Sequence, residues 1–134
     1  MFSTVAAVRV IQKSVTRMKH EVGVLVSPES QSQVLHSILS QGPYAPMRLE
    51  SLDDVPQYMQ GRASGVLILD LDSGPITNAT LRELKKKHPL TIIALSREQF
   101  HPGLEESLGH HIYACLGKPA DPDELLYVLK SIFA

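Results

Sequence analysis

Short apolar runs alternate with amphipathic segments along most of this chain. The apolar runs cover residues 22–26, 66–70, 91–96 and 112–116, and a weaker one, interrupted by Pro46, covers 44–49. A continuous apolar run of this length suits a strand buried on both faces, as in a parallel sheet covered by helices. We therefore predict five strands. Pro46 places the second of them at an edge of the sheet, because proline cannot donate a backbone hydrogen bond.

The segments between these runs have the spacing and the end signals of helices. The predicted helices cover residues 27–41, 51–60, 78–87, 102–108 and the segment from 122 onward. The apolar face of the first comprises Val34, Leu35, Ile38 and Leu39, and that of the last comprises Leu125, Leu126, Val128, Leu129 and Ile132. Strands that alternate with helices imply a parallel sheet with right-handed crossovers. The fold class is therefore α/β, with five strands and five helices.

The first 20 residues form a separate compositional unit. They hold four basic residues and no acid, whereas the whole 134-residue chain has a net charge of -1. Apolar residues at steps of three to four over 4–19 predict a basic helix, a strand through 5–11 being the alternative. A leader or linker, a docking or dimerising helix and a membrane-surface helix remain open for this segment. Residues 21–134 are predicted to form one domain.

Composition narrows the class of protein further. A single cysteine excludes an internal disulfide, so we expect a reducing, cytoplasmic location. No apolar run reaches the roughly 18 residues of a membrane span. The Lys85–Lys87 run lacks interleaved aromatics and is interpreted as a solvated helix end rather than a nucleic-acid site.

Polar residues follow three of the predicted strands at their carboxyl ends. Asp70 ends the third strand, Ser96 the fourth and Lys118 closely follows the fifth. If these strands are neighbours, the three side chains converge at one edge of the sheet, where open α/β sheets bind ligands. A carboxylate nucleophile beside a hydroxyl and an ammonium suits phosphoryl chemistry.

These residues resemble the receiver domain of two-component response regulators. The stretches "VLILDLDSG", "TIIALSRE" and "ACLGKPADPDELL" carry the resemblance. It implies a flavodoxin-like (βα)5 three-layer sandwich with strand order 2-1-3-4-5. It also implies that Asp70 is the phospho-acceptor, that Ser96 and Lys118 bind phosphoryl oxygens, and that the Lys118–Pro119 bond is cis.

The chain departs from the family pattern at the metal site. Receivers have two adjacent acids after the first strand that hold Mg²⁺, and here "VLVSPES" puts Ser27–Pro28 there. Mg²⁺ prefers carboxylates in near-octahedral geometry, so its attraction to this site is weak. Asp70, Asp72 and Glu29 are the remaining candidate ligands. Cys115 also stands where receivers carry an aromatic switch residue, and we interpret it as a small core residue.

We therefore predict a divergent receiver, not an enzyme, of bacterial phosphorelay signalling with impaired Mg²⁺-dependent phosphorylation. In this interpretation Asp70 pairs with Lys118, and the ion pair replaces the metal. The domain acts through protein contacts with a histidine kinase, a phosphotransfer protein, an output protein or a second copy of itself. The alternatives are a functional phospho-acceptor at Asp70, with Glu29 or Asp72 completing the metal site, and a flavodoxin-like small-molecule binder. His101, His110 and His111 lack zinc-like ligand spacing and are interpreted as solvated.

Overall fold

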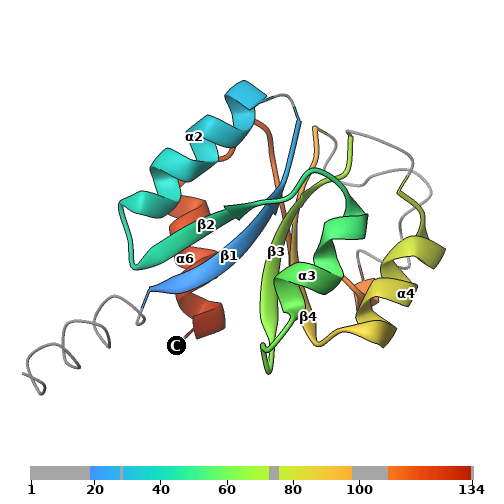
Figure 1. The fold of residues 1–134 in the computed structure, drawn as a ribbon. Coiled ribbons are helices and arrows are strands. Elements are labelled where there is room, and N and C mark those ends of the chain that lie inside the picture. Colours follow the sequence, from blue (N-terminus) through green and yellow to red (C-terminus); the bar gives the residue numbers. More distant parts are fainter. Residues whose placement is uncertain (1–18, 28, 73–75, 98–108, 134) are drawn as a thin grey trace, which may run out of the picture.

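Five parallel strands form one sheet at the centre of the molecule (Figure 1). The computed structural model describes residues 19–27, 29–72, 76–97 and 109–133, without the side chains of residues 29 and 30. The strands are β1 (His20–Leu25), β2 (Tyr44–Arg48), β3 (Gly65–Asp70), β4 (Leu90–Leu95) and β5 (Ala114–Leu116). Their order is β2-β1-β3-β4-β5, which confirms the predicted α/β fold and its strand order, with Pro46 on an edge strand.

Helices cover both faces of the sheet and complete three layers (Figure 1). The helices α2 (Glu29–Ser40) and α6 (Pro122–Phe133) pack on one face. The short helix η1 (Leu52–Asp54) with α3 (Val55–Met59), and α4 (Asn78–Lys87), cover the other face. Four of the five predicted helices are thereby confirmed. The predicted helix over 102–108 and the basic segment 1–18 lie outside the described residues.

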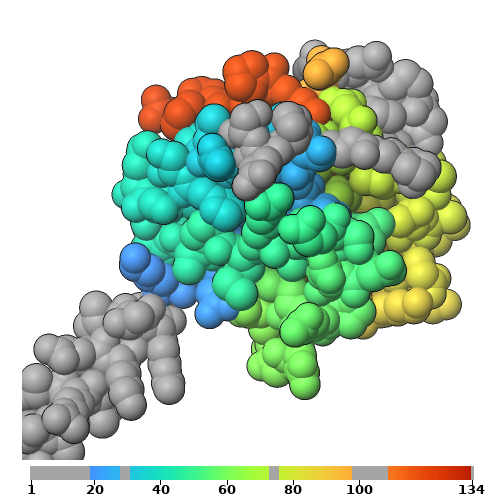
Figure 2. Space-filling view, turned by 45° about the horizontal axis from the view of Figure 1, so that its top comes forward, coloured from blue at the N-terminus to red at the C-terminus, as the bar shows by residue number. Residues whose placement is uncertain are grey.

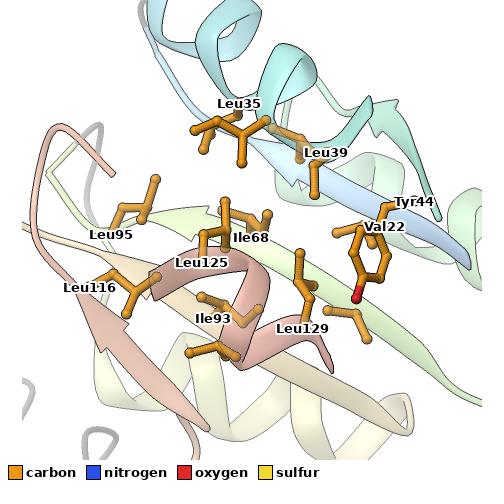
Figure 3. Packing of buried hydrophobic residues seen from close by; sticks show 14 residues of the cluster. Val22, Leu35, Leu39, Tyr44, Ile68, Ile93, Leu95, Leu116, Leu125 and Leu129 are labelled. Carbon is orange, nitrogen blue, oxygen red and sulfur yellow. The ribbon is translucent and has the colours of Figure 1, made fainter. Parts of the chain in front are cut away.

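The alternation of side chains along β3 divides the core into two clusters. Val66 and Ile68 point to the α2 and α6 side, whereas Leu67 and Leu69 point to the α3 and α4 side. Figure 3 shows the first cluster, in which Leu35, Leu39, Leu125 and Leu129 of the helices surround Ile68 and Ile93 of the sheet. Because β3 is buried along its whole length, the residue that ends it is buried as well.

Three features differ from the sequence expectations, and one of them is β5, which begins at Ala114, two residues later than predicted. Val34 was expected on the buried face of α2 but is 51% exposed, so this expectation is wrong. The neighbouring Leu35 and Leu39 already fill that side of the core, and Val34 lies outside the stripe they form. The strand β1 also begins two residues earlier than predicted. The His20 N–H donates to the Pro43 carbonyl oxygen, and the His20 ring stacks on Phe133 at 4.1 Å between centroids.

Candidate functional site

The carboxyl ends of β3, β4 and β5 meet at one edge of the sheet, as the sequence predicted. Asp70 pairs in register with Leu95, and the next residue, Ser96, donates its N–H to the Leu116 carbonyl oxygen of β5. Lys118 follows two residues after β5, and its Lys118–Pro119 bond is cis, as predicted. Figure 2 turns this edge forward. The blue atoms that follow β1 lie there between the cyan atoms of α2 and the green atoms of η1 and α3.

The Asp70 carboxylate is buried and accepts hydrogen bonds on both oxygens. Lys118 Nζ lies 2.6 Å from Asp70 Oδ1, with 9% of the Lys118 side chain and 0% of the Asp70 side chain exposed. The Asp72 N–H donates to the same oxygen at 2.9 Å, and Gln31 Nε2 donates to Asp70 Oδ2 at 3.4 Å. A buried carboxylate is tolerated when it is paired and hydrogen-bonded in this way.

Asp72 contributes a second carboxylate to the same ion-pair cluster. Its Oδ2 atom accepts a hydrogen bond from Lys118 Nζ at 3.1 Å and another from the Arg97 N–H at 2.9 Å. Lys118 therefore lies between two carboxylates, one buried and one at the surface. The two carboxylates and the ammonium of this cluster sum to a net charge of -1.

The described side chains do not fit an Mg²⁺ site. Mg²⁺ requires about six oxygen ligands at short distances, most of them water and carboxylate oxygen. Here the Asp70 oxygens face N–H donors, and Asp72 Oδ2 faces the Lys118 ammonium. Among the residues that the structure describes, no three or more His, Cys, Asp or Glu side chains are grouped to hold a metal ion. Glu29 begins α2, but its side chain lies outside the described part of the chain.

Cys115 and Ser96 line a small hollow beside the ion-pair cluster. The hollow has a volume of about 310 Å³ and is also lined by Arg97, Leu116, Gly117 and Glu124. Ser96 is almost fully buried, with 2% of its surface exposed. Burial, and to a lesser degree the Asp72 carboxylate, raises the pKa of the Cys115 thiol above its ordinary value. The thiol is therefore kept protonated and is not a nucleophile. Cys115 was predicted as a small core residue, but it is only partly buried against the second core cluster.

A larger hollow of about 480 Å³ lies on the β1 side of Asp70. It is lined by Leu25, Val26, Ser27, Glu50, Ser51, Leu52, Asp53, Leu69, Asp70 and Ile76. Sequence reasoning predicted a crevice at the strand ends but not the residues that line this hollow, and it missed the contacts of Gln31 and of the Arg97 N–H. The only sequence signal for Gln31 is its place in the first turn of the helix that follows β1, next to the missing acidic pair.

The fold is shared with solved receiver domains. The signal receiver domain of an HD domain-containing protein from Pseudomonas fluorescens Pf-5 has 23% sequence identity and a TM-score of 0.71, over 84% of this chain and 93% of that one. A response regulator from Thermotoga maritima has 15% identity and a TM-score of 0.72, over 85% and 97% of the two chains. A response regulator receiver domain protein from Methanospirillum hungatei JF-1 has 18% identity and a TM-score of 0.67, over 86% and 96%.

These similarities establish the fold as that of response regulator receiver domains. No protein-family model matches the chain, and no curated protein matches its sequence. No helix in the described ranges has the length and apolar character needed to cross a membrane.

Proposed function

We propose that this domain is a divergent receiver that signals through protein–protein contacts, with impaired Mg²⁺-dependent phosphorylation of Asp70. One observation carries the proposal: N–H donors contact both oxygens of the Asp70 carboxylate, and the nearest is the Lys118 ammonium at 2.6 Å. In this proposal the domain is not an enzyme. Its partners are a histidine kinase, a phosphotransfer protein, an output protein or a second copy of the chain.

Phosphoryl transfer gives the physical reason. A carboxylate that attacks phosphorus needs a lone pair directed at the donor and a cation that neutralises the phosphoryl oxygens. In this site the Asp70 Oδ2 atom accepts from the Gln31 amide, and Lys118 is already bound by two carboxylates. Without a bound divalent cation, the transfer loses its main source of charge stabilisation. The ion pair in place of the metal then holds the strand ends in one arrangement.

Beryllofluoride with Mg²⁺ tests this proposal, because it mimics a phosphorylated aspartate only where the metal site works. Amide NMR signals of Asp70, Ser96 and Lys118 are expected to stay in place at millimolar Mg²⁺. Saturable shifts of these signals that disappear in Asp70→Asn would instead establish the functional phospho-acceptor. A mass increase of one phosphoryl group after incubation with acetyl phosphate and Mg²⁺ would contradict the proposal in the same way.

The 480 Å³ hollow supports a second candidate function, the binding of a small molecule. Its lining combines aliphatic side chains such as Leu25 and Ile76 with the carboxylates of Glu50 and Asp53, which suits an amphipathic ligand with a positive charge. Native mass spectrometry of the purified protein tests this candidate. A copurifying mass that Leu52→Trp displaces supports it, whereas a spectrum of the bare chain alone counts against it.

A further inference from the structure

The geometry points to Asp72 as an internal anion that closes an oxyanion site formed by Lys118 Nζ and the Arg97 N–H. This inference rests on the proposed function, because it explains what the ion-pair cluster does in a receiver that is not switched by phosphorylation. The ligand class excluded by Asp72 is a small inorganic oxyanion such as phosphate.

Two donors from different segments of the chain converge on a single oxygen atom. Lys118 lies in the segment after β5, and its Nζ atom is 3.1 Å from Asp72 Oδ2. Arg97 lies in the segment after β4, and its backbone N is 2.9 Å from the same oxygen. An ammonium and a backbone N–H directed at one point form the donor set that binds carboxylate, phosphate and sulfate oxygens. In this protein the oxygen comes from the chain itself.

The turn after β3 holds the Asp72 carboxylate in this position. The Asp72 N–H donates to Asp70 Oδ1 two residues earlier, so the backbone of Asp72 is fixed by the side chain that ends the strand. A group delivered by such a short segment competes with free ligands at a high effective concentration. A dissolved oxyanion must displace Asp72 and also approach the buried Asp70 carboxylate, which repels it.

One carboxylate thereby joins the carboxyl ends of three strands. Asp72 belongs to the segment after β3, and its Oδ2 atom contacts groups that follow β4 and β5. A phosphoryl group on Asp70 would place a negative charge beside Lys118 and the Arg97 N–H. Here the Asp72 carboxylate places that charge there without any modification. The surface beside β4 and β5 is therefore held constantly in a single state that a partner protein can recognise.

Hydrogen exchange of the Arg97 amide tests the contact directly. In Asp72→Ala the exchange rate is expected to rise by about tenfold or more, the size of effect that a hydrogen bond to a charged acceptor gives. Glu83→Ala, which removes an exposed carboxylate on α4, is the matched control and is expected to leave the rate unchanged. An unchanged Arg97 rate in a folded Asp72→Ala protein would overturn the inference.

Titration with inorganic phosphate, followed by the same amide signal, tests the site itself. The wild-type protein and Glu83→Ala are expected to show no saturable shift of Arg97, and Asp72→Ala is expected to show one. Asp72→Asn keeps the shape without the charge and is expected to bind phosphate with intermediate affinity. Equal affinity in wild type and Asp72→Ala, or no binding to folded Asp72→Ala, contradicts the inference.

The two proposals fail separately. The exchange measurement uses neither Mg²⁺ nor a phosphodonor, so it reports on the Asp72 contact alone. If beryllofluoride and Mg²⁺ shift the wild-type signals while Arg97 exchange rises in Asp72→Ala, the impaired phosphorylation is refuted and the Asp72 contact stands.

Discussion

Lys118 is the residue on which the charge balance of this site depends. Its ammonium lies 2.6 Å from the fully buried Asp70 carboxylate and 3.1 Å from the Asp72 carboxylate. A buried ion pair adds little net stability compared with apolar residues, but removing one partner leaves an uncompensated buried charge. Replacing Lys118 alone is therefore expected to lower the stability of the fold more than replacing both Asp70 and Lys118.

Lys118→Met is expected to lower the free energy of unfolding by about 3 kcal/mol, because Asp70 is then buried without its cation. The double variant Asp70→Asn/Lys118→Met is expected to recover much of this loss, since no buried charge remains. Urea denaturation of the two single variants and the double variant measures the coupling. Additive losses would show that the two side chains do not depend on each other.

The pH dependence of Cys115 alkylation tests how strongly burial and the nearby Asp72 carboxylate affect this edge of the sheet. Its pKa is raised by burial and by the Asp72 carboxylate, so the reactive thiolate forms only above the ordinary pH range for cysteine. Alkylation by iodoacetamide at about pH 8 is therefore expected to be slower in the folded protein than in the urea-unfolded chain, and its pH midpoint is expected to lie higher. Equal rates and midpoints in the two states would show an unperturbed thiol.

Among the elements, α2 shows how closely a helix fits the sheet beneath it. Leu35 and Leu39 of α2 are almost completely buried in the first core cluster, whereas Val34 is 51% exposed. An apolar residue in the sequence of a helix is therefore not a core residue unless it lies within the stripe that faces the sheet.

Leu35→Ala is expected to destabilise the protein by about 3 kcal/mol, because it opens a cavity between α2 and the sheet. Val34→Ala on the same helix is the matched control. It is expected to change the stability by less than about 0.5 kcal/mol, since the side chain is half-exposed and alanine favours helix. Thermal and urea unfolding of the two variants measure the difference. Similar losses in both would mean that Val34 is covered in solution.

For the whole molecule, the buried members of both core clusters lie within 22–129 among the residues that the structure describes. The helices α2 and α6 close one face of the sheet, and α3 with α4 closes the other (Figure 1). Every core residue that the structure describes therefore remains in a chain that begins at Lys19.

A chain that begins at Lys19 is therefore expected to fold with nearly the same free energy of unfolding as the full chain. Because cores supply most of the stability of a domain, the difference is expected to stay within about 1 kcal/mol. Urea denaturation of the two chains measures it. A markedly less stable short chain would show that residues 1–18 pack against the domain.

The apolar pattern predicted the parallel sheet, the resemblance to receiver domains supplied its strand order, and the two together predicted the meeting of Asp70, Ser96 and Lys118. The continuous apolar runs are signals that depend only on burial, and parallel strands necessarily bring their carboxyl ends to one edge. Helix ends were equally readable: the Asp121-Pro122 start of α6 and the extent of α4 both agree with the structure.

The Asp70–Lys118 ion pair was also predicted, but only the tertiary structure decided the other contacts at that edge. The alternation along a strand predicts which face of the sheet each side chain points to. Gln31 lies in a first helical turn, and Asp72 and Arg97 lie in loops after strands, where this alternation gives no information. Their hydrogen bonds depend on the distances between segments far apart in the chain. The sequence therefore determined which charges gather at this site, and the packing of the sheet determined that Asp72 joins Lys118 to the Arg97 amide.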